Sequence, residues 1–572
     1  MTAPRRLAAL LVLVAAAIVP HLPSQGGPFL YDDFRFVRDN AALSRPDVVI
    51  RAFVDPLATD PTGSGGGIYR PIRTLAFAAI RALFGSGPLP YHAANLLLHA
   101  LNSLLVLWSL VLILRSAGVA RPEVPAAAAA LLFAASPVQG ESVDWISSLD
   151  NLLFAAFCLV AIRVHAARGA AIGADLLVAS LYLFALFSKE MAAPLAAILL
   201  VFDRLARRPV KPLFRRYFLC AAAILIYAAA RALALRGEFG QRGPWGDSLA
   251  THAAVALLAL GNDAVRVVLP LFPDPFAFDR QVAIPDSPLD GRVVASLAVA
   301  LVLVAAAVGG VVRRTPAGTL VAAFLLARLP ASQVPFALNI VVADRFLYLP
   351  LAFGGAALAL AVRSAVGRLP APARAPALAA VFASFLLFAF LAAVNARRFA
   401  SEEALWRAVV ARDPGHFRAH HGLGGVLARE GRATEAVEEL LVAARLEPGS
   451  PEVLRDLGRL LIASGFRAEG ADRLRDGVLL HAARGTRTES PEVAAMAFAA
   501  AEAFERDGRE AEAREMLRIL AETPSWADAA FFVRRGDLAL ALKDDAAAAE
   551  DWRRALALDP GHPPALQRLE SR

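Results

Sequence analysis

Apolar blocks of membrane-spanning length constrain the fold of this chain more than any other feature. Hydrophobic residues make up 57% of the sequence, against roughly 45–50% in soluble domains, and short charged loops separate their runs. A helix needs about 20 residues to cross the hydrocarbon core of a bilayer. We therefore expect about eleven spans, at residues 7–22, 91–115, 123–138, 143–164, 172–188, 189–204, 216–234, 291–312, 316–332, 346–363 and 374–394.

Two apolar segments have other interpretations. Segment 248–272 carries Asn262, Asp263 and Arg266 in its middle. Polar side chains are costly in lipid, so we expect an amphipathic or re-entrant helix here rather than a span. At the N-terminus, two arginines followed by a short apolar run also fit a cleaved signal peptide, an alternative to a first span.

The positive charge of the chain follows from the expected topology. The net charge is +8, and the basic residues, almost all arginine, lie mainly in alternate loops between the spans. Such loops face the cytoplasm. This predicts a cytoplasmic N-terminus, a C-terminus on the outer side, and no nucleic-acid partner. Cys158 and Cys220 lie in separate apolar runs, so we expect neither a disulfide framework nor a zinc site.

The C-terminal part of the chain has a different pattern, of short amphipathic helices. Pro414 and Pro448 lie 34 residues apart and flank Gly424 and Ala436, a spacing typical of the tetratricopeptide repeat (TPR). Looser copies are marked by Pro451, Pro491, Pro524 and Pro560. We expect an all-α chain, with a polytopic membrane domain at 1–396 and a stacked TPR solenoid at 397–572.

Two adjacent carboxylates stand out in the first outer loop. Asp32 and Asp33 follow the first expected span directly. A carboxylate pair at a membrane surface can act as a general base or contribute to a divalent-cation site. The alternative is a helix cap on a solvated loop.

Further polar residues gather on the same expected outer face. His92, Asn95 and His99 recur at helical spacing along one span, and so line one helical face. A row of polar groups inside a span indicates a wet cavity or an interhelical hydrogen-bond network. The other candidates on this side are Arg70, Glu141, Asp144, Lys189, Glu190, Arg345 and Tyr348.

Two of these candidates are cations suited to phosphate. Lys189 stands in a chain whose basic residues are almost all arginine, and a compact ammonium suits point-charge contact with a phosphate. Its alternative role is a salt bridge with a nearby acid. Arg345 lies at the mouth of a span beside aromatic residues, where it can bind a lipid phosphate or serve as an interfacial anchor.

Taken in order, these motifs resemble the transmembrane and TPR-containing O-mannosyltransferases, and in particular their bacterial homologues with the GT-C glycosyltransferase fold. The matching pieces are Tyr31 to Asp33, Tyr69 to Pro71, the helical face of His92, Asn95 and His99, the spaced residues Pro137, Glu141, Val143 and Trp145, Ser188 to Glu190, and Asp344 to Pro350. The chain departs from the family at Asp344 and Phe346, where Glu and Tyr are usual, and at Ser136, where His is more common.

The resemblance implies a membrane glycosyltransferase. Its donor would be a polyisoprenyl-phosphate monosaccharide, with mannose expected, and its acceptor a hydroxyl of an exported protein at the outer face of a bacterial inner membrane. Asp33 is the first choice for the base and Asp32 the second, with a divalent cation as an option at this pair. Lys189, Arg345, Tyr348 and Arg70 would hold the donor phosphate and lipid.

The remaining polar candidates, and the repeats, would serve the acceptor. His92, Asn95, His99, Glu141, Asp144 and Glu190 would line the acceptor side of the cavity. The TPR domain, on the periplasmic side, would hold an acceptor peptide or dock a partner protein. Two other functions stay open: another lipid-linked-glycan transferase, such as an O-antigen ligase or O-oligosaccharyltransferase, and a non-catalytic TPR membrane scaffold.

Overall fold

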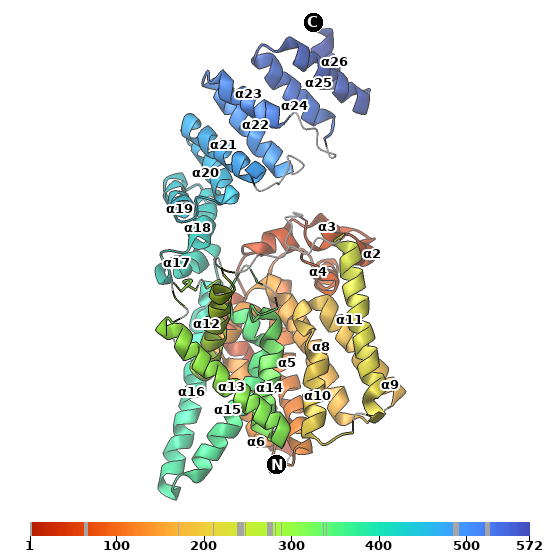
Figure 1. Cartoon of the computed structure of the whole chain (residues 1–572), viewed down its shortest axis with the longest axis vertical. Coiled ribbons are helices and arrows are strands. Elements are labelled where there is room, and N and C mark those ends of the chain that lie inside the picture. The colour runs from red at the N-terminus through yellow and green to blue at the C-terminus, as the bar shows by residue number, and fades with distance from the viewer. Residues whose placement is uncertain are drawn as a thin grey trace. The chain divides into compact units, whose positions relative to one another are not determined.

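The regular secondary structure of the described part of the chain is helical. The computed structural model describes residues 3–61, 67–169, 171–209, 211–236, 245, 248–270, 278–280, 282–285, 287, 289–335, 337–338, 340–483, 491–520 and 527–571. The regular elements in these ranges are all helices, and the β pairing recorded among them is a single bridge between Arg280 and Val342. The all-α prediction is confirmed (Figure 1).

The chain divides into two compact units, Met1–Leu405 and Trp406–Arg572. The long helices of the first unit are α1 (Ala3–Ile18), α5 (Leu89–Ser116), α6 (Glu123–Ala135), α8 (Leu149–Ala167), α9 (Ile172–Ser188), α10 (Leu195–Leu205), α11 (Phe214–Ala234), α12 (Leu249–Val268), α13 (Gly291–Arg313), α14 (Pro316–Arg328), α15 (Tyr348–Arg368) and α16 (Ala371–Arg398). The domain boundary expected after residue 396 lies inside α16.

Each expected span coincides with one of these helices. Among the described residues, seven helical segments are long and apolar enough to cross a membrane, and three shorter apolar helices, α6, α9 and α14 with its continuation to Ala331, accompany them. Helix α10, of 11 residues, is shorter still. The chain is a multi-pass membrane protein, and the count of eleven spans stays a prediction.

The basic loops meet at one end of the helix bundle. Arg363, near the C-terminal end of α15, donates to the carbonyl of Ala120, after α5, at 2.8 Å. Arg208, after α10, donates to the carbonyl of His165 at the end of α8, at 2.6 Å. Arg204 reaches the carbonyl of Val311 at the end of α13, at 3.4 Å. These contacts between loops distant in sequence place the arginines together, as the alternation of spans predicts.

Short helices cover the opposite end of the bundle. They are η1 (Val19–Ser24), η2 (Phe34–Arg38), η3 (Ala41–Ser44), α2 (Val48–Val54), α3 (Pro56–Thr59), α4 (Pro71–Phe84), η4 (Pro137–Gln139), α7 (Gly140–Val143), η5 (Ile146–Ser148), η6 (Glu190–Ala192), η8 (Leu329–Ala331) and η9 (Asp344–Leu347). Element η2 is a π-helix, a form often found at functional sites.

Helix α12 is tied to its neighbours by buried ion pairs. Arg328 of α14 donates from Nε to Asp263, and Arg266 donates to Asp344 at 2.5 Å, with all four side chains buried. The polar residues that argued against a lipid-exposed span therefore face protein. Pairing offsets part of the desolvation cost of burying these charges, and each charge depends on its partner.

The second unit is an array of helix hairpins (Figure 1). Helix α17 (Glu402–Arg412) leads into it, and the hairpins are α18 (Phe417–Arg429) with α19 (Ala433–Leu446), α20 (Pro451–Ala463) with α21 (Arg467–Ala483), α22 (Pro491–Arg506) with α23 (Glu510–Ile519), and α24 (Ala529–Ala541) with α25 (Asp545–Leu558), followed by α26 (Pro563–Glu570). The predicted repeats are confirmed as stacked hairpins; Pro524, the expected end of the third, lies outside the described residues.

Small residues and left-handed turns make these hairpins alike. A Cβ added to Gly424 of α18 would lie 2.7 Å from Cγ of Leu440 in α19, so the two helices touch where the residue is glycine. The turn inside each hairpin contains a residue with positive φ: Gly431 (79°), Gly465 (94°), Gly508 (74°) and, in the fourth, Lys543 (61°). Three of the four turns thus use the residue that adopts this conformation without steric cost.

Candidate active site

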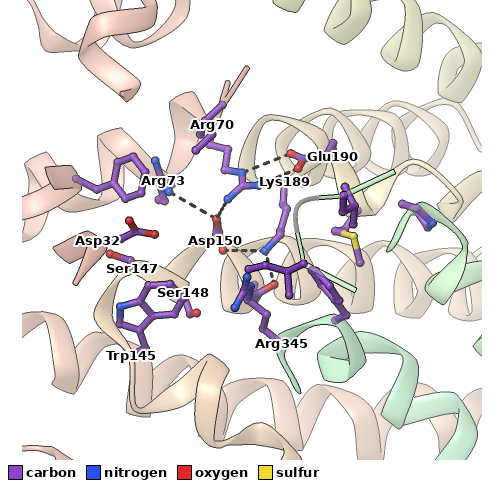
Figure 2. A pocket seen from close by; sticks show the side chains of 18 residues that line it. Asp32, Arg70, Arg73, Trp145, Ser147, Ser148, Asp150, Lys189, Glu190 and Arg345 are labelled. Carbon is purple, nitrogen blue, oxygen red and sulfur yellow. Dashed lines mark hydrogen bonds and ion pairs between the residues drawn. The ribbon is translucent and has the colours of Figure 1, made fainter. Parts of the chain in front are cut away.

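A charged cavity lies at the end of the bundle opposite the basic loops (Figure 2). Its volume is about 240 Å³. Its walls come from the segment between η1 and α4, the turn before α8, the turn after α9 and the segment between α14 and α15. The charged residues that line it are Asp32, Arg70, Arg73, Asp150, Lys189, Glu190 and Arg345.

Arg70 connects two acids across the cavity. It donates from Nη2 to Oε1 of Glu190 at 2.8 Å and from Nη1 to Oδ2 of Asp150 at 2.5 Å. The two carboxylates raise the pKa of Arg70 against the opposing effect of its burial, and Arg70 together with Arg231 and Lys189 holds the pKa of Glu190 well below its usual range although burial raises it. Arg70 therefore has its charge balanced before any substrate arrives.

Lys189 projects its ammonium into the same cavity. Nζ donates to the side-chain oxygen of Asn151 at 2.7 Å and lies 3.3 Å from Oδ1 of Asp150. The predicted salt bridge between Lys189 and an acid is present. Asp150 also serves Arg70 and lies 3.8 Å from Arg73, so three cations share one carboxylate. This leaves net positive charge on that side of the cavity.

Arg345 is fixed from behind by a buried carboxylate. Glu141 accepts hydrogen bonds from the Arg345 backbone N–H, at 2.9 Å, and from its guanidinium. Burial raises the pKa of Glu141, and Arg345 opposes this shift. The guanidinium lies 5.6 Å from the ring centre of Trp145 and 5.3 Å from that of Phe346. Aromatic rings and one acid thus hold Arg345 against the cavity wall.

The two adjacent aspartates have different environments. Asp32 lines the cavity and is partly exposed. Asp33 is fully buried, with Oδ2 accepting from the N–H of Leu30 at 2.9 Å and Oδ1 accepting from the N–H of Ser147 at 2.7 Å and from its hydroxyl. Asp32 therefore lines the cavity and Asp33 fastens the loop, a placement that favours Asp32, the second choice from the sequence, as the residue that meets a substrate.

Both carboxyl groups have raised pKa values. Burial raises the pKa of Asp32, while the guanidinium groups of Arg35, Arg345 and Arg73 oppose the shift. Burial raises the pKa of Asp33 to about 7, against the hydrogen bonds from Ser147 and Leu30 that favour the carboxylate. A carboxylate with a raised pKa is a stronger base than an ordinary one.

Besides Asp33 and Glu141, five of the predicted site residues are absent from the cavity lining. Tyr348 is buried, and its hydroxyl contacts Nδ1 of His99 at 2.9 Å and accepts from Asn102 at 3.2 Å. Asn95 donates to the carbonyl of Trp145 at 2.9 Å. The others are His92, which is fully buried, and Asp144, which binds His21 and Ser24. These polar side chains form a buried hydrogen-bond network beside the cavity, one of the two arrangements expected from their helical spacing.

Among the polar residues that line the cavity, Arg73, Ser147, Ser148, Asp150 and Asn151 were missing from the predicted site. Arg73 lies one helical turn after Arg70 and stacks over Phe36, 4.1 Å from its ring centre; the three-residue spacing was the available signal. Asp150 and Asn151 begin an apolar helix, where polar side chains are rare. Their position at that helix start could have marked them.

The described residues contain no group of three or more His, Cys, Asp or Glu side chains that could hold a metal ion. The divalent cation considered for the aspartate pair would need both carboxylates to converge. Both oxygens of Asp33 instead accept hydrogen bonds from backbone and hydroxyl donors. Asp32 and Asp33 therefore do not form a two-carboxylate ligand set in this arrangement.

In chemical terms, the cavity places one available carboxylate opposite a set of cations. In the view of Figure 2, Asp32 and Lys189 lie on opposite sides of Asp150. A carboxylate can take a proton from an incoming hydroxyl, and an ammonium and a guanidinium can stabilise a negatively charged leaving group. The arrangement suits transfer of a group from a phosphate ester to an alcohol.

Comparisons with known proteins find relatives for part of the chain. It is 27% identical over 222 residues to a protein O-mannosyl-transferase of Caenorhabditis elegans, covering 38% of this chain and 31% of the relative. It is 28% identical over 241 residues to the protein O-mannosyl-transferase Tmtc3 of Drosophila melanogaster, covering 37% of this chain and 26% of the relative. The resemblance predicted from the motifs is confirmed, although the matches span only about a third of the relatives' length.

No protein-family model matches the chain. Among solved structures, a Pseudomonas aeruginosa PilF structure matches with a TM-score of 0.24 at 21% identity, over 34% of this chain and 80% of that chain. YrrB, described as a TPR protein with an unusual peptide-binding site, matches with a TM-score of 0.18 at 12% identity, over 29% and 97%. The Cut9–Hcn1 heterotetramer matches with a TM-score of 0.21 at 13% identity, over 79% and 89%. TM-scores this low do not establish a shared fold.

Proposed function

We propose that this protein is a membrane O-mannosyltransferase that moves a monosaccharide from a polyprenyl-phosphate donor to hydroxyl groups of exported proteins. The observation that carries the proposal is the cavity of about 240 Å³ that Asp32, Lys189 and Arg345 line together. It lies at one end of a bundle of apolar helices, where a lipid phosphate at the bilayer surface has access. Similarity to protein O-mannosyl-transferases supports mannose as the sugar.

In this mechanism Asp32 acts as the general base. It accepts the proton of the acceptor hydroxyl as the oxygen forms a bond to the anomeric carbon of the sugar. The bond from that carbon to the phosphate oxygen breaks, and its electron pair leaves with the lipid phosphate. Lys189 and Arg345 stabilise this charge; general-base assistance contributes about 10²–10⁴-fold to such a step. Attack opposite the leaving group inverts the anomeric carbon.

The proposal includes an orientation in a bacterial inner membrane. The basic loops joined by Arg363, Arg208 and Arg204 lie at one end of the bundle, which the positive-inside rule assigns to the cytoplasm. The cavity then opens to the periplasm, where the donor is presented and exported proteins pass. The repeats, on the periplasmic side, would bind an extended acceptor segment.

The test is sugar transfer in proteoliposomes. Purified protein receives radiolabelled polyprenyl-phosphate mannose and a periplasmic protein extract, and label on protein is counted. The Asp32→Asn variant is compared with wild type, and Asp39→Asn serves as the matched control, because Asp39 is exposed and pairs with Arg38. We expect Asp32→Asn to lose at least a hundredfold in rate and Asp39→Asn to keep wild-type activity.

Other results would point elsewhere. Transfer from a different polyprenyl-phosphate sugar would change the donor and keep the reaction. Label that moves to a glycan or lipid instead of protein would favour another lipid-linked-glycan transferase. No consumption of any such donor by folded protein would contradict the proposal and favour a TPR scaffold.

A further inference from the structure

The segment that joins the last membrane helix to α17 touches the first outer loop. A Cβ built on Gly27 would lie 2.9 Å from the carbonyl oxygen of Phe399, so the loop and the end of α16 are in backbone contact. Beyond it, a carboxylate oxygen of Glu402 accepts a hydrogen bond from the backbone N–H of Tyr31 at 3.3 Å. Tyr31 immediately precedes Asp32, the proposed base.

A chain of aromatic rings makes a second connection between the same two segments. The ring of Phe399 lies 5.9 Å from that of Phe278, edge to face. Phe278 lies 5.5 Å from Trp145, and Trp145 lies 6.3 Å from Tyr31. Trp145 lines the cavity. Contacts at these separations each contribute modestly, and together they fix the position of a wall.

The loop needs such support because its backbone is strained. Tyr31 has a φ of 44°, in the left-handed region that is sterically unfavourable for a residue with a side chain. A strained residue keeps its conformation only where its neighbours enforce it. Asp33 fastens the loop to Ser147 on one side, and the contact with Glu402 acts on the other.

We propose that Phe399 and Glu402 are positioning residues that hold Asp32 at its place in the cavity. The proposal rests on the function proposed above. Neither residue lines the cavity, so neither would contact the substrate. Glu402 acts on the backbone of Tyr31, the residue before Asp32. Phe399 acts through Phe278 on Trp145, which forms part of the cavity wall.

The experiment measures loop protection and catalysis in the full-length protein. The variants are Phe399→Ala, Glu402→Ala and Glu402→Gln, because Gln keeps an oxygen that can accept the Tyr31 hydrogen bond. Controls are Phe390→Ala, whose side chain is 63% exposed on the same helix, and Glu469→Ala on the exposed face of α21. Hydrogen exchange of the segment 28–34 is followed alongside the kcat of sugar transfer and the KM for the donor.

We expect Glu402→Ala to raise amide exchange in 28–34 about fivefold, the change that loss of one ordinary hydrogen bond brings. Its kcat should fall about tenfold while the donor KM stays within roughly twofold, because a displaced base slows the chemical step without changing donor binding. Glu402→Gln should recover most of both effects. Phe399→Ala should resemble Glu402→Ala, and both controls should match wild type.

Two results would overturn the inference. In the first, Glu402→Ala and Phe399→Ala show the same amide exchange in 28–34 and the same kcat as the control variants. The other is exchange that rises throughout the membrane unit with kcat and KM changing together, which indicates general loosening. If wild type transfers no sugar but exchange in 28–34 responds selectively, the proposed function fails and the positioning contact stands.

Discussion

The adjacent residues Asp32 and Asp33 have different roles in the loop after η1. Asp32 has one face toward the cavity, whereas every oxygen of Asp33 is engaged by donors from Leu30 and Ser147. Because it is buried and its oxygens already accept three hydrogen bonds, Asp33 holds the loop in place and does not line the cavity. The pair is therefore better described as a base and its anchor than as two interchangeable acids.

The raised pKa of Asp33 predicts that the stability of the protein depends on pH. Burial raises the pKa of Asp33 to about 7, so the folded state binds its proton more tightly than the unfolded chain does. The stability that this protonation contributes is complete below about pH 4 and is lost as pH rises through about 7. In nanodiscs, the Tm of wild type should therefore fall relative to that of Asp33→Asn between pH 6 and 8.

A matched control has the opposite shift. The hydrogen bond from Arg38 holds the pKa of Asp39 below its ordinary value, so Asp39 stays ionised throughout this range. The difference in Tm between wild type and Asp39→Asn should be independent of pH from 6 to 8. Parallel Tm curves for wild type and Asp33→Asn would contradict the assignment of a raised pKa to Asp33.

At the scale of elements, the turns of the four repeat hairpins share a left-handed backbone position but not the residue that occupies it. Glycine occupies the left-handed position in three hairpins and Lys543 occupies it in the fourth. Lys543→Gly should stabilise the fourth hairpin by about 0.5–1 kcal/mol, since the steric cost of the lysine backbone exceeds the entropic cost of glycine. Thermal unfolding followed by circular dichroism measures this.

The reverse substitution provides the comparison. Gly465→Ala places a side chain at a φ of 94° and should destabilise the second hairpin by at least 1 kcal/mol. If Lys543→Gly lowers the Tm instead, the lysine side chain makes contacts that outweigh its backbone strain.

The ion pairs of α12 lead to a second prediction at this scale. Removing one member of a buried pair leaves an uncompensated charge, which typically costs about 3–5 kcal/mol. We expect Asp263→Leu alone to lower thermal stability in detergent strongly. Asp263→Leu combined with Arg328→Leu should recover most of the loss, because the arginine that would be left without its carboxylate is removed as well. Additive effects of the two substitutions would show that the side chains do not interact.

The helices could be predicted from the sequence because length and apolarity decide them locally. Each expected span coincides with a helix, and the shortest, α10, ends early where Arg207 and Arg208 follow. The charges of segment 248–272 set it apart from the expected spans, but the partners of those charges were not predictable. Arg328 and Asp344 lie far along the chain, and no local pattern indicates which helices pack together.

The candidate site was predictable to the same degree. Motif order indicated Asp32, Arg70, Lys189, Glu190 and Arg345, which the cavity brings together. It also indicated His99 and Tyr348, which share a hydrogen bond in the core. A polar residue on a helix faces either a cavity or another helix, and spacing along one helix does not distinguish these.

At the scale of the whole molecule, the separation of charge makes orientation testable. Basic loops occupy one end of the bundle and the cavity the other, so with an odd number of spans the repeats and the cavity face the same compartment. Single cysteines at Gly87, Gly169 and Gly561 report on the cavity end, a basic loop and the repeats. An added Cβ meets nothing within 4 Å at Gly87 and Gly169, and only a carboxylate oxygen of Asp559 at 3.8 Å at Gly561.

The measurement is labelling with a membrane-impermeant maleimide. Cys158 and Cys220 are buried and should stay unlabelled in the native fold. In intact spheroplasts, Gly87→Cys and Gly561→Cys should label and Gly169→Cys should not; in inverted vesicles the pattern should reverse. Labelling of Gly87→Cys and Gly561→Cys from opposite sides would mean an even number of crossings. The repeats would then lie across the membrane from the cavity, where they could not present an acceptor to Asp32.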